Sequence, residues 1–213
     1  MSVYQKLFAH GLALGDDAQH RVYGARKRAL FADRTGTVVE IGPGTGVNLP
    51  YLPDGIRWIG VEPNPHMHRF LREQLAGRDL NADLRTASAQ DTGLPAACAD
   101  AVVSTLVLCS VPDLDATLAE LHRILKPGGR LYFIEHVVAD EGTWLRLLQK
   151  GIRPLWQPLA DGCRPDRDTG AALERAGFAT VDSERFDTGL PVVAPHIMGI
   201  ATKARTTKTT AVP

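Results

Sequence analysis

A β-branched run that ends in an acid and continues at once into a glycine-dense loop constrains this fold most. The stretch reads VVEIGPGTGVNLP and spans residues 38–50. A continuous apolar run is typical of a parallel strand that is covered on both faces of its sheet. Glycines directly after such a strand let the backbone approach a ligand closely, because they lack Cβ. The stretch therefore predicts an α/β fold with a nucleotide-like ligand beside its first strand.

Strand-like and helix-like segments alternate along the rest of the chain. Strands are expected at 37–41, 57–62, 83–87, 101–108 and 130–137, and helices at 68–77, 114–125 and 169–178. Two closing strands are expected in ATVDSERFD and PHIMGIATK. This order favours a Rossmann-like, doubly wound and mostly parallel sheet.

The chain of 213 residues suits a single α/β domain, which we expect over residues 1–203. Residues 1–32 predict an N-terminal helical cap. Residues 138–168 predict an irregular, lid-like insert that shapes the substrate pocket, because prolines interrupt any helical periodicity there. The polar end, residues 204–213, predicts a disordered tail.

The charge balance and the cysteines exclude several classes of protein. Lys+Arg and Asp+Glu both count 24, so net charge gives no argument for nucleic-acid binding. The three cysteines form no CxxC pair, which predicts neither a disulfide framework nor a metal site and suits a reducing compartment. We find no apolar run long enough for a membrane span. We therefore expect a cytoplasmic protein with a small-molecule partner, and the sequence leaves its oligomeric state open.

The glycine loop departs from two common phosphate-binding patterns. A P-loop needs a lysine after its last glycine, and none follows Gly46. A dinucleotide fingerprint needs a third glycine where this chain has Val47. S-adenosylmethionine is the remaining choice, because Glu40 before the loop would attract its sulfonium and ammonium charges but repel a pyrophosphate.

The second strand ends in another acid. Glu62 follows Gly42 by 20 residues, a spacing that suits an acceptor for both ribose hydroxyls. The turn after the third strand, with Ser88, Ala89 and Gln90, is expected to lie against the adenine.

Four longer motifs, VVEIGPGTG, GVEPNP, DAVVSTLVLCSV and LHRILKPGGRLYFIEHV, resemble class I S-adenosylmethionine-dependent methyltransferases over about residues 35–137. Together, EPNPH, TLVLCSV, EHV, DGCRPDR and PHIMG resemble the animal methyltransferase-like alkyl thiol S-methyltransferases and their bacterial relatives. The resemblance implies a seven-stranded sheet with an antiparallel last strand. The animal enzymes carry a hydrophobic N-terminal anchor, which we do not expect here.

The same resemblance, together with the loop and strand-end positions, suggests the cofactor contacts. They are Glu40, Gly42, Pro43, Gly44, Thr45, Gly46, Asn48, Glu62, Pro63, Asn64, Ser88, Ala89, Gln90, Thr105 and Leu106.

Candidate catalytic residues lie at strand ends and in the insert: His136, Cys109, Asp161 and His196. Open α/β sheets place their ligands at such strand ends. Each residue also has a structural interpretation, such as a strand-end hydrogen bond for His136 or a salt bridge for Asp161. Methyl transfer depends mainly on orientation, and an acceptor thiol with a pKa near ~8.5 needs little help to ionise.

We therefore expect S-methylation of a small thiol. An O- or N-methyltransferase of a natural product or quinone-like ring stays open. A non-catalytic cofactor-binding protein also stays open, and an NAD-dependent reductase is a third, weaker alternative.

Overall fold

Seven strands form one sheet in the order β3-β2-β1-β4-β5-β7-β6. This computed structural model describes residues 3–205. The strands are β1 (Thr37–Ile41), β2 (Arg57–Val61), β3 (Asn81–Arg85), β4 (Ala99–Thr105), β5 (Leu125–His136), β6 (Thr180–Asp187) and β7 (Pro195–Thr202). The strand β7 runs antiparallel to both of its neighbours, and the pairs among the first five strands are parallel. The expected Rossmann-like sheet with an antiparallel last strand is confirmed.

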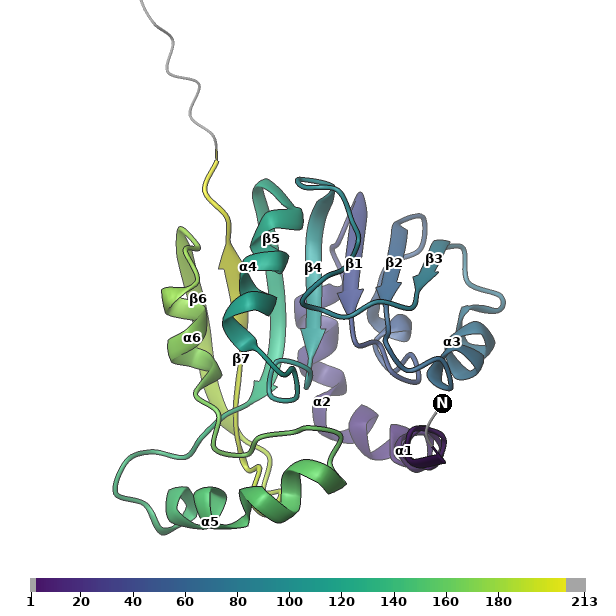
Figure 1. The fold of residues 1–213 in the computed structure, drawn as a ribbon. Coiled ribbons are helices and arrows are strands. Elements are labelled where there is room, and N and C mark those ends of the chain that lie inside the picture. The colour runs from purple at the N-terminus through teal and green to yellow at the C-terminus, as the bar shows by residue number, and fades with distance from the viewer. Residues whose placement is uncertain (1–2, 206–213) are drawn as a thin grey trace, which may run out of the picture.

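The helices lie on both faces and at one end of this sheet (Figure 1). They are α1 (Val3–Leu14), α2 (Asp16–Phe31), α3 (Met67–Leu75), α4 (Leu114–Ile124), α5 (Trp144–Leu159) and α6 (Thr169–Arg175), and a short 3-10 turn covers Leu49–Tyr51. Among the described residues, no helix is both long and apolar enough to cross a lipid bilayer. Residues 206–213, most of the expected disordered tail, lie outside the described residues.

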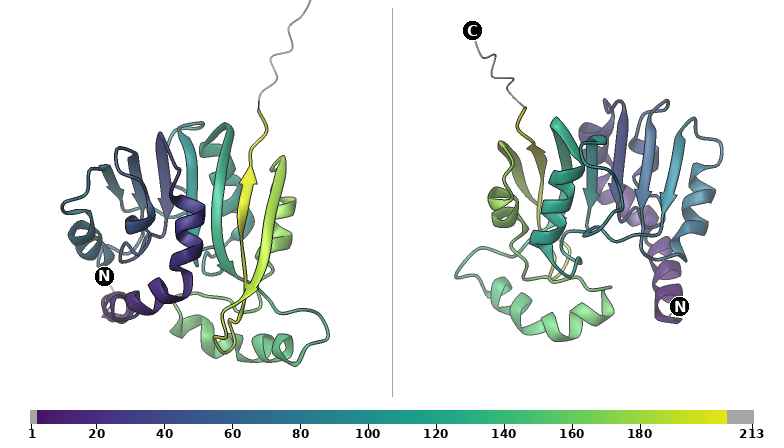
Figure 2. Two further views of the ribbon diagram at one scale, coloured as in Figure 1. Left: turned by 180° about the vertical axis from the view of Figure 1, so that it is seen from behind. Right: turned by 45° about the horizontal axis from the view of Figure 1, so that its top comes forward.

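Two apolar clusters sandwich the sheet. One joins Leu118 and Leu121 of α4 and Leu173 of α6 to one face of the sheet. The other joins Phe31 of α2 and Leu71 of α3 to the opposite face. Figure 2 shows α2 on the face that α4 and α6 leave uncovered. Burial on both faces explains why the central strands are almost wholly apolar.

The helices α1 and α5 lie at the end of the sheet to which the arrowheads of the parallel strands point (Figure 1). Ligands of open α/β sheets bind at this end. The cap predicted over residues 1–32 is thus two helices, one of which stands at the ligand end.

The expectation of an irregular segment over residues 138–168 was wrong in its centre. A helix of 16 residues, α5, contains both Pro154 and Pro158. Its start is capped by Thr143, whose hydroxyl accepts a hydrogen bond from the Arg146 backbone N–H. A proline inside a helix costs about 3 kcal/mol and leaves a carbonyl unpaired. Much of α5 is exposed, so water can satisfy those carbonyls.

Candidate active site

A cavity of about 530 Å³ opens at the carboxyl ends of the parallel strands. Its walls come from the glycine loop, from the turns after β2, β3 and β4, and from His136 at the end of β5. Helices α1, α2 and α5 and the segment before β7 complete the walls. The cavity therefore joins segments from both halves of the chain.

The glycine loop forms one wall and depends on its glycines. Gly42 has a φ of +55°, and a Cβ there would lie 2.7 Å from Cγ2 of Val107. Gly44 has a φ of +58°, and its Cβ would lie 3.2 Å from Cδ2 of Leu12. The backbone conformation disfavours a side chain at both positions, and at Gly42 the contact with Val107 opposes it as well.

Glu62 fixes the loop from the end of β2. Its Oε2 accepts a hydrogen bond from the Gly44 backbone N–H at 3.0 Å, and Oε1 accepts one from the Asn64 N–H at 2.8 Å. Burial raises the pKa of this carboxyl to about 7. A carboxylate offers about four lone-pair sites, so Glu62 retains acceptor capacity toward the cavity.

Glu40 lies behind the loop and does not line the cavity. Its two oxygens accept hydrogen bonds from Asn48 Nδ2 at 2.8 Å and from Trp58 Nε1 at 2.9 Å. Asn48 lines the cavity, and its buried Oδ1 has no hydrogen-bond partner within residues 3–205. Because a buried acceptor normally has a donor, this oxygen fits a ligand ammonium group. Glu40 therefore positions Asn48, and a direct role for Glu40 at the cofactor stays a prediction.

Twelve of the fifteen predicted cofactor contacts line the cavity. They are Gly42, Pro43, Gly44, Thr45, Asn48, Glu62, Pro63, Ser88, Ala89, Gln90, Thr105 and Leu106. Glu40, Gly46 and Asn64 do not. Leu106 has a φ of +58°, a strained conformation for a side chain of its size. Such strain is often found at functional sites.

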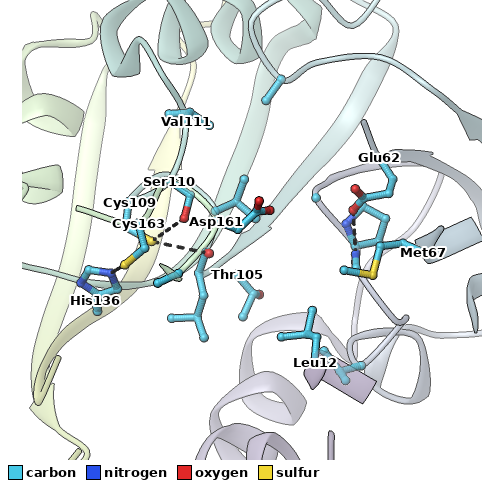
Figure 3. A pocket seen from close by; sticks show the side chains of 18 of the residues that line it. Leu12, Glu62, Met67, Thr105, Cys109, Ser110, Val111, His136, Asp161 and Cys163 are labelled. Carbon is cyan, nitrogen blue, oxygen red and sulfur yellow. Dashed lines mark hydrogen bonds between the residues drawn. The ribbon is translucent and has the colours of Figure 1, made fainter. Parts of the chain in front are cut away.

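Thiols and an imidazole converge at the other end of the cavity (Figure 3). Nε2 of His136 lies 2.9 Å from Sγ of Cys163, and Trp156 donates its Nε1–H to the same sulfur at 3.3 Å. Sγ of Cys109 donates to the Leu106 carbonyl at 3.6 Å. Cys109, His136 and Cys163 are all buried, and all line the cavity.

The two sulfurs of this cluster differ in acidity. A hydrogen bond with Cys109, followed by one with His136, holds the pKa of the Cys163 thiol well below its usual range. The same hydrogen bond with Cys163, followed by burial, raises the pKa of the Cys109 thiol. Cys163 is thus the more acidic of the two thiols.

His196 lines the cavity beside this cluster. Its Nε2 lies 2.8 Å from the Tyr23 hydroxyl, and its Nδ1 lies 3.0 Å from the Ala194 carbonyl oxygen. Burial is the main cause that lowers the pKa of His196 to about 4. The ring is therefore neutral at pH 7 and a weak base.

Asp161 also lines the cavity and is exposed to solvent. Its backbone N–H donates to the Tyr4 hydroxyl at 3.0 Å, which links the loop after α5 to α1. The salt bridge expected for an aspartate of the insert forms at a neighbour, where Asp166 lies 3.3 Å from Arg153.

Arg167 holds the turn that carries Cys109, a role that the sequence did not reveal. It is buried, and its Nη1 donates to the carbonyls of Leu108 at 2.8 Å and Val111 at 2.6 Å. The Arg164 backbone N–H donates to the Cys109 carbonyl at 3.0 Å. The DGCRPDR motif therefore packs directly on the turn after β4.

The cap contributes further cavity residues that the sequence analysis missed: Phe8, Leu12, Gln19 and Tyr23. Their positions relative to β4 and β7 depend on tertiary packing, and no spacing in the sequence signals them.

Comparisons with known proteins agree with this geometry. Residues 39–133 match a family model described as a methyltransferase domain. The human thiol S-methyltransferase TMT1B is 36% identical, over 92% of this chain and 86% of its own. The human thiol S-methyltransferase TMT1A is 38% identical, over 84% of this chain and 79% of its own.

Solved structures show the same fold. A Thermotoga maritima methyltransferase, described as a possible histamine N-methyltransferase, superposes with a TM-score of 0.67 at 20% identity. That superposition covers 95% of this chain and 98% of the other. The Haemonchus contortus phosphoethanolamine N-methyltransferase 2, solved with S-adenosylhomocysteine, also gives 0.67, at 14% identity, over 90% of this chain and 57% of its own.

The fold and the cavity define a class I methyltransferase. The chain belongs to the methyltransferase family that contains the thiol S-methyltransferases TMT1A and TMT1B. It is an S-adenosylmethionine-dependent enzyme.

Proposed function

We propose that this enzyme transfers the methyl group of S-adenosylmethionine to the sulfur of a small, largely apolar thiol. The carrying observation is that one cavity runs from Glu62 and the glycine loop to the Cys109–His136–Cys163 cluster. The thiol specificity named for the human relatives supports this choice of acceptor. The cofactor supplies an activated methyl on a sulfonium, so the protein's task is to orient the acceptor.

The cofactor half of the site is assigned to the glycine-loop end. Glu62 would accept the ribose hydroxyls with its remaining lone pairs, and Oδ1 of Asn48 would accept the ammonium of the methionine end. The turn with Ser88, Ala89 and Gln90 would hold the adenine. Thr105 and Leu106 lie at the end of β4, shortly before Cys109 in the sequence. They would border the transferred methyl group.

The acceptor half is assigned to the opposite end. Cys109, His136 and His196 surround the position for the nucleophile, and Asp161 and Trp156 border it from the segment at the end of α5. Leu190 and Val193 add apolar wall, which suits an apolar acceptor.

The low basicity of His196 favours sulfur over oxygen as the methyl acceptor. An alcohol, or a phenol with a pKa near ~10, needs a strong base at the moment of transfer. His196, with its pKa lowered to about 4, cannot act as one. A thiol with a pKa near ~8.5 is already partly ionised at neutral pH.

We also assign the enzyme to the cytoplasm. All three cysteines are free, and two of them line the cavity. A reducing compartment keeps such thiols unpaired.

The nucleophile is tested with acceptors that differ in one atom. Benzyl thiol, benzyl alcohol and benzylamine are offered to the enzyme with methyl-labelled cofactor, and products are measured by mass spectrometry. We expect the thioether alone. Methylation of the alcohol or amine without the thiol would refute S-methylation. Calorimetric binding of S-adenosylhomocysteine with no turnover of any acceptor would favour a non-catalytic cofactor-binding protein.

A further inference from the structure

Three soft metal ligands converge at the acceptor end of the cavity. Cys109 follows β4, His136 ends β5 and Cys163 follows α5, yet their donor atoms all lie within 4.8 Å of one another. Two thiolates and an imidazole form a ligand set that favours Zn²⁺ over hard cations. The separation of the ligands along the chain explains why spacing alone predicted no metal.

We propose that Cys109, His136 and Cys163 bind one Zn²⁺ ion whose fourth position takes the sulfur of the acceptor thiol. The role in catalysis rests on the proposed thiol specificity, whereas binding of the ion does not. Within residues 3–205, the ligand group contains three members and no fourth. Three protein ligands with an open position are typical of catalytic zinc sites, while structural sites are closed by four.

The geometry needs a small adjustment to accept the ion. Zn–S bonds of about 2.3 Å and Zn–N bonds of about 2.0–2.1 Å place tetrahedral ligand atoms roughly 3.5–3.8 Å apart. Nε2 of His136 and Sγ of Cys163, now 2.9 Å apart, must separate by roughly 0.6–0.9 Å. Side-chain rotation can supply this when the ion replaces the proton that the two atoms share.

The surroundings of the ligands set the expected affinity. Trp156 donates its Nε1–H to Cys163, as groups around metal-bound thiolates commonly do. Nδ1 of His136 is buried and has no partner among the described residues, so this imidazole lacks the usual second hydrogen bond. Because such outer partners are worth about 10–100-fold in affinity, we expect binding weaker than at a structural zinc site.

The ion would promote loss of the proton that the acceptor thiol must release before it attacks the methyl group. Binding of an R–SH sulfur to Zn²⁺ forms a Zn–S bond and releases the thiol proton to water, because a coordinated thiol is deprotonated. The thiolate sulfur then forms the new S–CH₃ bond while the sulfonium S–CH₃ bond breaks. That bond's electron pair stays on the departing sulfur. The thioether product is neutral and a poor ligand, so it leaves the ion.

Charge favours the same arrangement. Two cysteine thiolates neutralise Zn²⁺, so adding the acceptor thiolate gives the centre one net negative charge. That charge would face the cationic sulfonium across the cavity, where opposite charges attract.

Metal content and a cobalt spectrum test the site directly. The full chain, purified under a phosphine reductant that keeps the cysteines reduced, should hold about one zinc per chain by elemental mass spectrometry. After chelation and addition of Co²⁺, we expect a near-ultraviolet thiolate-to-cobalt band and the visible bands of a tetrahedral site. Addition of benzyl thiol should strengthen the charge-transfer band, because a third thiolate joins the ion.

Matched variants assign the ligands. Cys163→Ser and His136→Gln should lose the tetrahedral spectrum, whereas Cys98→Ser, at a half-buried cysteine packed against the core, should keep it. Calorimetric binding of S-adenosylhomocysteine shows whether each variant is folded. Absence of the thiolate-to-cobalt band in the unmodified protein, or its persistence in folded Cys163→Ser, would overturn the site.

The activity measurement separates this proposal from the proposed function. Removal of zinc should lower kcat/KM for benzyl thiol about tenfold or more, and Zn²⁺ should restore it. If the stripped enzyme methylates the thiol at an unchanged rate, the catalytic role of the ion is refuted while S-methylation stands. If cobalt binds as expected but no thiol is methylated, the proposed function fails and the ligand assignment stands.

Discussion

His136 and His196 occupy opposed positions of the antiparallel β5–β7 pair, with ring centroids 6.1 Å apart, yet they bind different partners. Nε2 of His136 lies against Cys163, and Nε2 of His196 lies against the Tyr23 hydroxyl. This residue pair of the sheet therefore connects the cavity to the segment after α5 and to helix α2 through two side-chain contacts.

The first prediction concerns His196 and acid stability. Burial lowers the pKa of His196 from 6.5 to about 4, so the folded protein holds this ring neutral and unfolding lets it take up a proton. Its contribution to stability is complete above pH 6.5 and is lost as the pH falls toward 4. We expect His196→Gln to flatten the fall of Tm across this window, measured by circular dichroism. His10→Gln, at an exposed histidine, should keep the parent slope. An unchanged slope in His196→Gln would contradict the assignment.

The second prediction concerns Glu62 and cofactor affinity. Its pKa is raised to about 7 by burial, and the ionised carboxylate accepts hydroxyl hydrogen bonds better than the acid. We expect S-adenosylhomocysteine to bind more tightly as the pH rises from 6 through 8, by calorimetry. Glu62→Gln should weaken binding about 10–100-fold and remove this dependence, since hydrogen bonds to a charged group contribute about 1.5–3 kcal/mol.

Glu73→Gln is the control for this experiment, because Glu73 is exposed and pairs with Arg69 on the surface of α3. Its cofactor affinity should match the parent protein at each pH. A pH dependence that survives in Glu62→Gln would assign the titration to another group.

The third prediction separates two costs at Gly42. Gly42→Ala must adopt a φ of +55° and place its Cβ 2.7 Å from Val107. Gly55→Ala must adopt a φ of +77° with open space around the new methyl group. A left-handed backbone conformation costs an L-residue about 1–2 kcal/mol. We therefore expect Gly55→Ala to lower the free energy of unfolding by about that amount, and Gly42→Ala to lower it clearly more.

Urea unfolding measures both variants, and Val107→Ala combined with Gly42→Ala tests the clash. The double variant should regain the part of the unfolding free energy that the clash removes. The cost of the left-handed backbone conformation should remain. Equal losses for Gly42→Ala and Gly55→Ala would show that the contact with Val107 has no energetic weight.

The fourth prediction concerns Arg167. Arg167→Met leaves the buried carbonyls of Leu108 and Val111 without their donor, which we expect to cost about 2 kcal/mol or more. Because this turn carries Cys109, KM for the thiol should rise while the affinity for S-adenosylhomocysteine changes little. Steady-state kinetics and calorimetry measure the two effects.

Arg153→Met supplies the comparison for Arg167. Its ion pair with Asp166 is partly exposed, and such pairs contribute about 0–1 kcal/mol. If both arginine variants lose the same small amount of stability, the carbonyl contacts of Arg167 do not hold the turn.

Patterns of adjacent residues predicted the sheet well. TVVEI forms β1 over Thr37–Ile41. An apolar, β-branched run is buried best in the middle of a sheet that is covered on both faces. The prediction failed at α5, where Pro154 and Pro158 suggested a break in the helix. Solvent exposure decides whether a helix tolerates such prolines, and exposure is a property of the folded molecule.

The site was predictable where one motif carries it and unpredictable where distant segments meet. The glycine loop and Glu62 follow the neighbouring strands β1 and β2, which a short connection joins, so spacing located them. Glu40 received a cofactor role from its charge, but the tertiary structure pairs it with Trp58 on β2. The cluster of Cys109, His136 and Cys163 draws on three segments whose approach depends on the whole sheet.

Helix α1 walls the cavity with Phe8 and Leu12, and the Tyr4 hydroxyl bonds to the Leu159 carbonyl at 3.4 Å across 155 positions of sequence. Helix α1 therefore belongs to the reaction chamber itself. A fragment trimmed to the methyltransferase motif would expose the cofactor to water. A low turnover number of such a fragment would therefore result from the deletion and not from the enzyme itself.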